Sequence, residues 1–468
     1  MFVGEFITLD NSQPEVQAIA VTNGRITATG TADEILASAG EQTQRIDIPG
    51  VAVPGWVDAH VHVSGLGSVL DQLNVEAMSI EAIRDEVAAA ARATPPGGWI
   101  VGRGWDEGYF RTPRDPTAAD LDEVSPDHPV VLRGIGGHSA WVNSHALERA
   151  GITAETPDPD GGRIVRDSEG RATGLLLEQA DTLVAAVMPA DTPESRERQI
   201  RTALTQYARW GLTGVHDAGV DLEEIAIYKK LLAADELPIR VYAMAAGDAA
   251  VAHYLARGPE PDLGDGRLSI RSFKIAVDGA LGARGAELSA PYSDAPETSG
   301  LSQMSDTDLD AFIDAARAEG FQVNAHVIGD RGVERALDAI ERTGVATAER
   351  FRLEHASIIS PPNVPRFAKL GVIASLQPVF LGEYSRWGEA RLGPDRTPWI
   401  MPVRDLIQSG AELASGTDYP ASDTGDPTAT LAALVTREGF DGRPEGGWFP
   451  EQAVDVETAL RSMSSAPA

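Results

Sequence analysis

The sequence predicts an α/β protein whose main part is a (β/α)₈ TIM-type barrel, with a small β-sandwich-like unit and an inserted subdomain. From Val51 onward, short apolar segments rich in β-branched residues alternate with helix-like segments. The strand candidates are residues 51–60, 211–219, 239–247, 271–279, 321–330, 351–359, 371–379 and 411–420. A barrel of this kind is closed by eight strands, which is the number of candidates. A doubly wound open sheet is the alternative that the same alternation allows.

Helix-like segments separate these strand candidates. Residues 306–320 and 330–344 are two of them, and each ends in a glycine that suits a helix C-cap. Strands that alternate with helices in this way form parallel sheets, in which the carboxyl ends of the strands meet at one side. The pattern therefore predicts a main domain over residues 51–468.

The first 50 residues carry a different pattern. Short alternating stretches occupy residues 5–10, 17–30 and 44–50. The "TNGR" at residues 22–25 lies between two β-like runs, and Asn-Gly in that place is a strong hairpin signal. We therefore expect residues 1–50 to form a small β unit in front of the barrel.

One connection is much longer than an ordinary loop between a strand and a helix. About residues 63–205 separate the first barrel strand candidate from the second. This stretch has β-like pieces of its own at residues 98–104, 129–137 and 161–170. We therefore expect an inserted subdomain at the end of the barrel where active sites form.

The composition limits the classes of function. The net charge is −31, and a surface of that sign repels nucleic acid and anionic membranes. The absence of cysteine excludes disulfides, thiolate metal sites and a cysteine nucleophile. The chain has no apolar run of about 18 residues, and its first residues lack the pattern of a secretory signal. These observations favour a cytoplasmic protein.

Histidines gather at the predicted carboxyl ends of strands. The stretch "PGWVDAHVHVSG" places His60 and His62 one residue apart, so in a strand both side chains point to the same face. His216, His326 and His355 also lie near strand ends. A lone buried histidine is more often structural, but several at one end of a barrel favour a shared metal ion. Asp418, after the last strand candidate, adds a carboxylate ligand or base, although alone it would suit a turn.

Lys274 is a further unusual position. The chain has lysine only at positions 229, 230, 274 and 369, and only Lys274 lies inside an apolar strand candidate. A buried lysine amine can lose its proton, whereas a guanidinium cannot. A neutral amine can form a Schiff base or react with CO₂ to give a carbamate that bridges two cations. A buried ion pair with Asp278 is the structural alternative.

Together these motifs resemble the amidohydrolase superfamily, and in particular its branch of metal-dependent hydrolases that includes N-substituted formamide deformylase. The resemblance covers nearly the whole chain. It rests on "DAHVH", "FKIAVDGALG", "NAHVIGD", "RLEHASII" and "SGTDYP", and on "GRGWDEG" and "GGHSAWVNSHALERAGI" in the insertion. It implies hydrolysis of a C–N bond in an amide, formamide or related N-acyl small molecule.

The resemblance also implies a role for each site residue. His60 and His62 would bind a first divalent metal, zinc or a similar ion. Carboxylated Lys274 would bridge it to a second metal held by His326 and His355. Asp418 would bind the first metal and move the proton. In the insertion, His138 and Trp105 would contact the substrate, although an aromatic side chain such as Trp105 more often serves packing.

Members of this branch continue beyond the position that matches Ala468 with strands that complete the β-sandwich. We therefore expect residues 1–50 to lack those partner strands. Two other functions stay open: a Schiff-base lyase or aldolase that uses Lys274, and a non-catalytic binding protein on the same fold. The sequence is also compatible with a homo-oligomer.

Overall fold

The computed structural model describes residues 1–468 except 112–113, 135–138, 160 and 468. This described chain divides into two compact units, and we consider each by itself. The first comprises Met1–Leu66 and Ile200–Ala468, and the second comprises Gly67–Gln199. The boundaries expected near residues 50, 63 and 205 remain an interpretation of the sequence.

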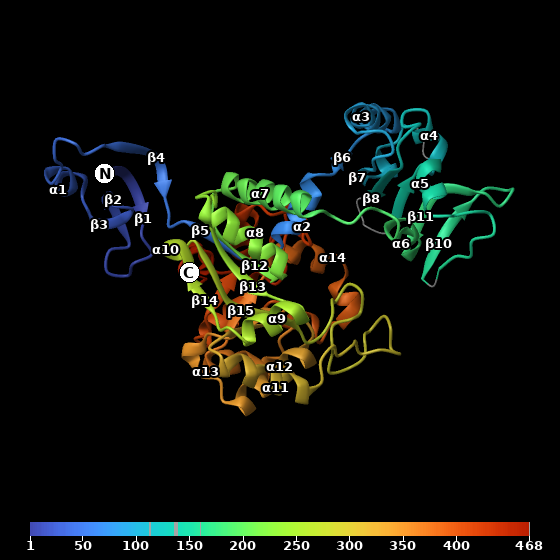
Figure 1. Cartoon of the computed structure of the whole chain (residues 1–468). Helices are drawn as coiled ribbons and strands as arrows, with labels where there is room; N and C mark the ends of the chain where they lie inside the picture. The colour runs from blue at the N-terminus through green and yellow to red at the C-terminus, as the bar shows by residue number, and fades with distance from the viewer. Residues whose placement is uncertain (112–113, 135–138, 160, 468) are drawn as a thin grey trace. The chain divides into compact units, whose positions relative to one another are not determined.

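A barrel of parallel strands forms the main part of the first unit (Figure 1). Among the described residues its neighbouring strands follow the order β19-β18-β17-β16-β15-β13-β12-β5, and the short β14 (Glu260–Asp262) pairs with β15 in antiparallel fashion. The Asp418 N–H donates to the His60 carbonyl oxygen at 2.7 Å, which links the two ends of the sheet. The barrel strands are β5 (Trp56–Val61), β12 (Leu212–Val220), β13 (Arg240–Ala245), β15 (Leu268–Ala276), β16 (Gln322–Val327), β17 (Arg352–His355), β18 (Ile373–Leu376) and β19 (Leu413–Ser415). The predicted barrel is confirmed.

Helices alternate with the barrel strands and cover their outer faces. In α12 (Asp330–Thr343), Val333, Ala336, Leu337 and Ile340 are buried at helical spacing, and Gly344 closes the helix with a φ of 65°. The other helices of this unit are α1 (Ala32–Ala37), α8 (Leu222–Ala233), α9 (Asp248–Leu255), α10 (Leu263–Gly266), α11 (Asp306–Ala318), α13 (Val364–Leu370), α14 (Leu381–Leu392), α15 (Val403–Gln408), α16 (Pro427–Thr436) and α17 (Val456–Ser462). None of the helices in the described ranges is long and apolar enough to cross a membrane.

The first barrel strand begins later than the sequence pattern predicted. Val51 and Ala52 belong to β4 (Ile46–Ala52) of the N-terminal sheet, where they pair with Glu5 and Phe6. The barrel strand β5 starts only at Trp56. Pro54 lies between the two strands and has no N–H for a sheet ladder, so one continuous strand is disfavoured there.

The N-terminal residues form a separate sheet. In the described part of the chain it has the order β3-β2-β1-β4 and contains β1 (Phe2–Ile7), β2 (Glu15–Thr22) and β3 (Arg25–Gly30) as well as β4. The hairpin predicted at "TNGR" joins β2 to β3. Asn23 and Gly24 have φ values of 53° and 73°, as a turn with two left-handed residues requires.

The second unit has a mixed sheet of its own with the order β10-β11-β9-β8-β7-β6 over the described residues. Its strands are β6 (Leu73–Asn74), β7 (Ile100–Trp105), β8 (Val130–Gly134), β9 (Ser139–Val142), β10 (Gly162–Arg166) and β11 (Ala172–Glu178). Its helices are α3 (Ile80–Ala93), α4 (Ala118–Asp122), α5 (Ser144–Arg149) and α6 (Thr182–Ala185), while α2 (Val63–Leu70) and α7 (Pro193–Arg209) carry the chain into and out of it. Its apolar side chains pack into two clusters within this unit.

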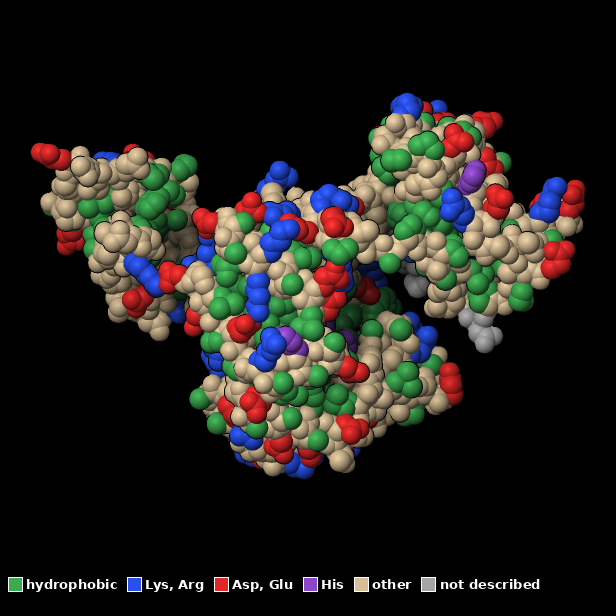
Figure 2. All heavy atoms as spheres, in the orientation of Figure 1, with side chains coloured by type: hydrophobic (Ala, Val, Ile, Leu, Met, Phe, Trp, Pro, Cys, Tyr) green, Lys and Arg blue, Asp and Glu red, His purple; other side chains and the backbone are tan. Residues whose placement is uncertain are grey.

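Acidic and basic side chains intermingle over the visible face of the molecule (Figure 2). On this face the acidic side chains are therefore not gathered in one patch.

Candidate metal centre

His60 lies on β5, and its orientation is set by a buried carboxylate from β17. The His60 Nδ1 atom is 2.6 Å from the Glu354 Oε2 atom, and both side chains are fully buried. Because a carboxylate accepts hydrogen bonds, this contact places the His60 proton on Nδ1 and leaves the Nε2 lone pair free. That pairing is typical of histidines that bind metals.

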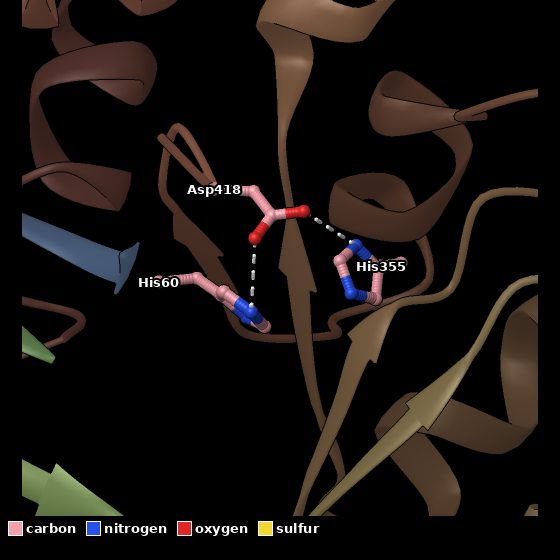
Figure 3. A group of neighbouring side chains, drawn as sticks. All are labelled: His60, His355 and Asp418. Atoms are coloured by element: carbon pink, nitrogen blue, oxygen red, sulfur yellow. Dashed lines mark ion pairs between the residues drawn. The ribbon is translucent and has the colours of Figure 1, made fainter. Parts of the chain in front are cut away.

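Asp418 follows β19 and brings its carboxylate to the histidines (Figure 3). Its Oδ1 atom is 3.5 Å from His60 Nε2 and 3.0 Å from His62 Nε2. Its Oδ2 atom is 4.0 Å from His355 Nδ1. The ligand atoms of His60, His355 and Asp418 all lie within 4.8 Å of one another. Side chains that are far apart in the sequence therefore converge where the parallel strands end, as the sequence predicted.

Lys274 on β15 points into the same cluster. Its Nζ atom is 3.1 Å from His60 Nε2. Burial, the largest cause, lowers the pKa of the Lys274 ammonium below its ordinary value, although the Glu354 and Asp418 carboxylates oppose the shift. The amine therefore loses its proton more readily than the amine of an exposed lysine does.

The alternative ion pair between Lys274 and Asp278 is not formed among the described residues. Asp278 instead accepts backbone N–H groups from Glu287, Ile328 and Gly329 at 2.9, 2.8 and 2.8 Å. These bonds hold the loop after β15 against the end of β16. The Asp278 carboxylate thus stabilises the backbone near the cluster through these hydrogen bonds.

His326 completes the group from β16. Its ring centroid lies 4.5 Å from that of His355, and burial together with the Lys274 charge lowers the His326 pKa to about 4. A cavity of about 360 Å³ opens over the cluster. The side chains that line this cavity include His62, Lys274, His326, His355 and Asp418.

The donor set fits a divalent metal ion. The His326 Nε2 atom is buried and has no hydrogen-bond partner among the described residues, and the buried Asp418 Oδ1 atom has only the imidazole nitrogens of His60 and His62 as near neighbours. Such groups are costly unless something binds them. Burial also lowers the pKa values of His60 and His355 well below the ordinary value, so these imidazoles are neutral, as metal ligands must be.

Two further histidines of the described chain, His216 and His128, have partners outside this cluster. His216 on β12 lies 2.6 Å from an Arg352 nitrogen, and His128 contacts the Gly98 carbonyl oxygen at 3.1 Å. His138, which we expected to contact the substrate, lies outside the described residues. Its role stays a prediction.

Trp105 is packed inside the second unit. It is 4% exposed, donates from Nε1 to the Leu132 carbonyl oxygen at 2.8 Å, and stacks on Phe110 at 6.2 Å. This position favours the packing role that the sequence left as the alternative, and contact with substrate stays a prediction for Trp105.

Two buried acids near the cluster were not predicted from the sequence as residues of the site. One is Glu354, and the other is Asp58, which accepts from the Thr417 hydroxyl at 2.7 Å and from the His60 N–H at 3.1 Å. Burial raises the pKa of Asp58 to about 7. Asp58 therefore ties β5 to the loop that carries Asp418. The sequence carries a signal for both acids, because Glu354 directly precedes His355 and Asp58 lies two positions before His60 in a strand.

A (β/α)₈ barrel with imidazoles and a carboxylate at the carboxyl ends of its strands is the arrangement of a metal-dependent hydrolase. The chain belongs to the amidohydrolase family, whose model matches residues 50–468. It is 34% identical to the putative amidohydrolase YtcJ of Bacillus subtilis over 98% of this chain and 87% of that relative. It is 29% identical to N-substituted formamide deformylase of Arthrobacter pascens over the same shares of the two chains.

A solved structure agrees with this assignment. The chain is similar to an uncharacterized metal-dependent hydrolase from Pyrococcus horikoshii, with a TM-score of 0.80 and 28% identity. The match covers 100% of this chain and 92% of that structure. The chain is therefore a member of a family of metal-dependent hydrolases.

Glu354 is expected to act as a positioning residue for His60. We expect Glu354→Gln to weaken metal binding by about 10- to 100-fold, because the neutral amide polarises the imidazole less and leaves Arg352 without its buried carboxylate partner. The measurement is the metal dissociation constant by competition with a chelator, together with the midpoint of thermal unfolding. Ser375→Ala is the matched control, since it removes the 2.7 Å bond to Glu354 and spares the His60 contact. Equal metal affinity in Glu354→Gln and the parent would contradict this role.

Proposed function

We propose that the protein hydrolyses a non-peptide C–N bond in an amide, formamide or related N-acyl small molecule. The observation that carries the proposal is the cluster of neutral imidazoles around Asp418, with an unpartnered His326 Nε2 atom and a cavity that the His326 and Asp418 side chains line. The likeness to N-substituted formamide deformylase supports the choice of bond.

In this proposal, His60, His62, Lys274, His326, His355 and Asp418 hold one or two divalent ions. Zinc suits nitrogen and oxygen donors without thiolates. A bound ion of this kind polarises a carbonyl oxygen and makes water nucleophilic at neutral pH. Asp418 accepts the proton of the attacking water at its carboxylate and delivers it to the leaving nitrogen as the C–N bond breaks.

Schiff-base chemistry is the second candidate, because burial lowers the pKa of Lys274. It gives no role to the unpartnered His326 Nε2 atom or to the convergence of His60, His355 and Asp418. Borohydride trapping with substrate separates the two functions: a hydrolase gives no reduced adduct, whereas a lyase gains the mass of the substrate on Lys274.

The metal requirement leads to a direct prediction. The purified protein is expected to contain about one or two equivalents of zinc or a related divalent ion, and a strong chelator is expected to abolish turnover until metal is restored. Elemental analysis and activity before and after chelation measure this. Full activity of the metal-free protein would contradict the proposed metal-dependent hydrolysis.

A hydrolysis screen identifies the substrate class. The panel consists of N-formyl, N-acyl, cyclic imide and ester compounds, each tested with the metal-loaded protein. Turnover of the first two groups above that of the esters is the expected result. A preference for esters would show that the bond cleaved is C–O rather than C–N.

A further inference from the structure

A second cavity lies at the opposite mouth of the barrel, where the strands begin. Its volume is about 370 Å³, and Arg240, Gln322 and Arg352, the first residues of β13, β16 and β17, contribute to its wall. It shares no lining residue with the cavity over the metal cluster. The proposed hydrolysis gives this cavity no role.

The wall of this cavity is rich in arginine. Arg240, Arg271, Arg350 and Arg352 line it, against the single carboxylate of Asp262. Arg350 is paired with Glu412 at 3.1 Å and Arg352 with Glu354 at 2.7 Å. In the described part of the chain, Arg240 and Arg271 are exposed residues at the mouth of the cavity and form no ion pair and no side-chain hydrogen bond. In a chain with a net charge of −31, this cluster makes a local positive site.

The buried part of the wall offers hydrogen-bond donors. Arg352 and His216 are 3% and 7% exposed, and an Arg352 Nη1 N–H donates to His216 Nδ1 at 2.6 Å. His216 is neutral, because burial and the nearby Arg352 charge lower its pKa well below the ordinary value. With Nδ1 accepting, the His216 proton is on Nε2. The second Nη1 N–H of Arg352 has no acceptor among the described residues.

We propose that this cavity binds a small oxyanion, with Arg240 and Arg271 as its principal cationic partners. Guanidinium groups bind the oxygens of phosphate and carboxylate through paired, charge-assisted hydrogen bonds. The His216 N–H and the spare Arg352 N–H add donors from the buried wall. An anion is attracted by these two exposed guanidinium groups, whereas a cation is repelled by them.

Isothermal titration calorimetry of the metal-loaded protein tests the proposal. Inorganic phosphate and succinate are titrated separately at constant ionic strength, which distinguishes a phosphate from a carboxylate ligand. We expect saturable binding of at least one of them. The double variant Arg240→Gln/Arg271→Gln is expected to weaken it by about tenfold or more, since hydrogen bonds to charged groups are lost.

Arg209→Gln/Arg404→Gln is the matched control, because both are exposed arginines outside the cavity wall and their loss removes two positive charges, as the double variant does. This control is expected to bind the anion as the parent does. An anion held by the metal centre would bind equally well to the double variant, so unchanged affinity there overturns the proposal. Absence of saturable binding to the parent, or equal weakening in the control, overturns it as well.

Discussion

Asp418→Asn is expected to lower turnover by about 10²- to 10⁴-fold while the barrel stays folded, because this is the usual contribution of a general base. Asparagine has nearly the same shape, so the Asp418 backbone N–H can still donate to the His60 carbonyl oxygen at 2.7 Å. Its amide cannot accept the proton of the attacking water. Most of the metal is expected to remain, since the imidazoles are unchanged.

The measurements are kcat, metal content and the midpoint of thermal unfolding for each variant. Asp423→Asn is the matched control, because Asp423 is an exposed aspartate in the same loop, and its nearest partner is Arg386 at 3.7 Å. This control is expected to retain the parent rate. If Asp418→Asn retains a rate within a few-fold of the parent, Asp418 is structural and another group must accept the proton.

Lys274→Ala is expected to remove metal and activity together. An ammonium group at this position would repel divalent ions, so the amine must change its charge to take part in the site. The neutral amine attacks the carbon of CO₂, the N–C bond forms, and the nitrogen loses a proton to give a carbamate. This product is an anion with two oxygens, and each of them can bind a cation.

Two further results distinguish a carbamate from a merely structural lysine. Short carboxylates are expected to restore part of the metal content and activity of Lys274→Ala, because they can supply the missing oxygens. Lys274→Arg is expected to stay inactive, since a guanidinium keeps its positive charge. Lys369→Ala is the control, because Lys369 is exposed on α13 and is paired with Glu341 at 2.7 Å. A crystal structure with metal bound beside an unmodified Lys274 would reject the carbamate.

The barrel was predictable from sequence because the information for it is local. Alternation of apolar strands with helices, and glycines such as Gly344 at helix ends, appear within windows of a few residues. Parallel strands then bring their carboxyl ends to one side whatever the details of packing. The convergence of His60, His355 and Asp418 was therefore predictable from their places along the chain.

Only the tertiary structure decided which side chains contact one another. His60 and Glu354 are 294 positions apart, yet their side chains share a buried hydrogen bond. Lys274 contacts His60 rather than Asp278, and Arg352 joins His216 to Glu354 through the barrel interior. Each such choice depends on distances between side chains from different strands and on the cost of burying an unpaired polar group. Both are properties of the closed barrel. The sequence by itself determined the strands, the helices and the end of the barrel at which the candidate metal ligands gather.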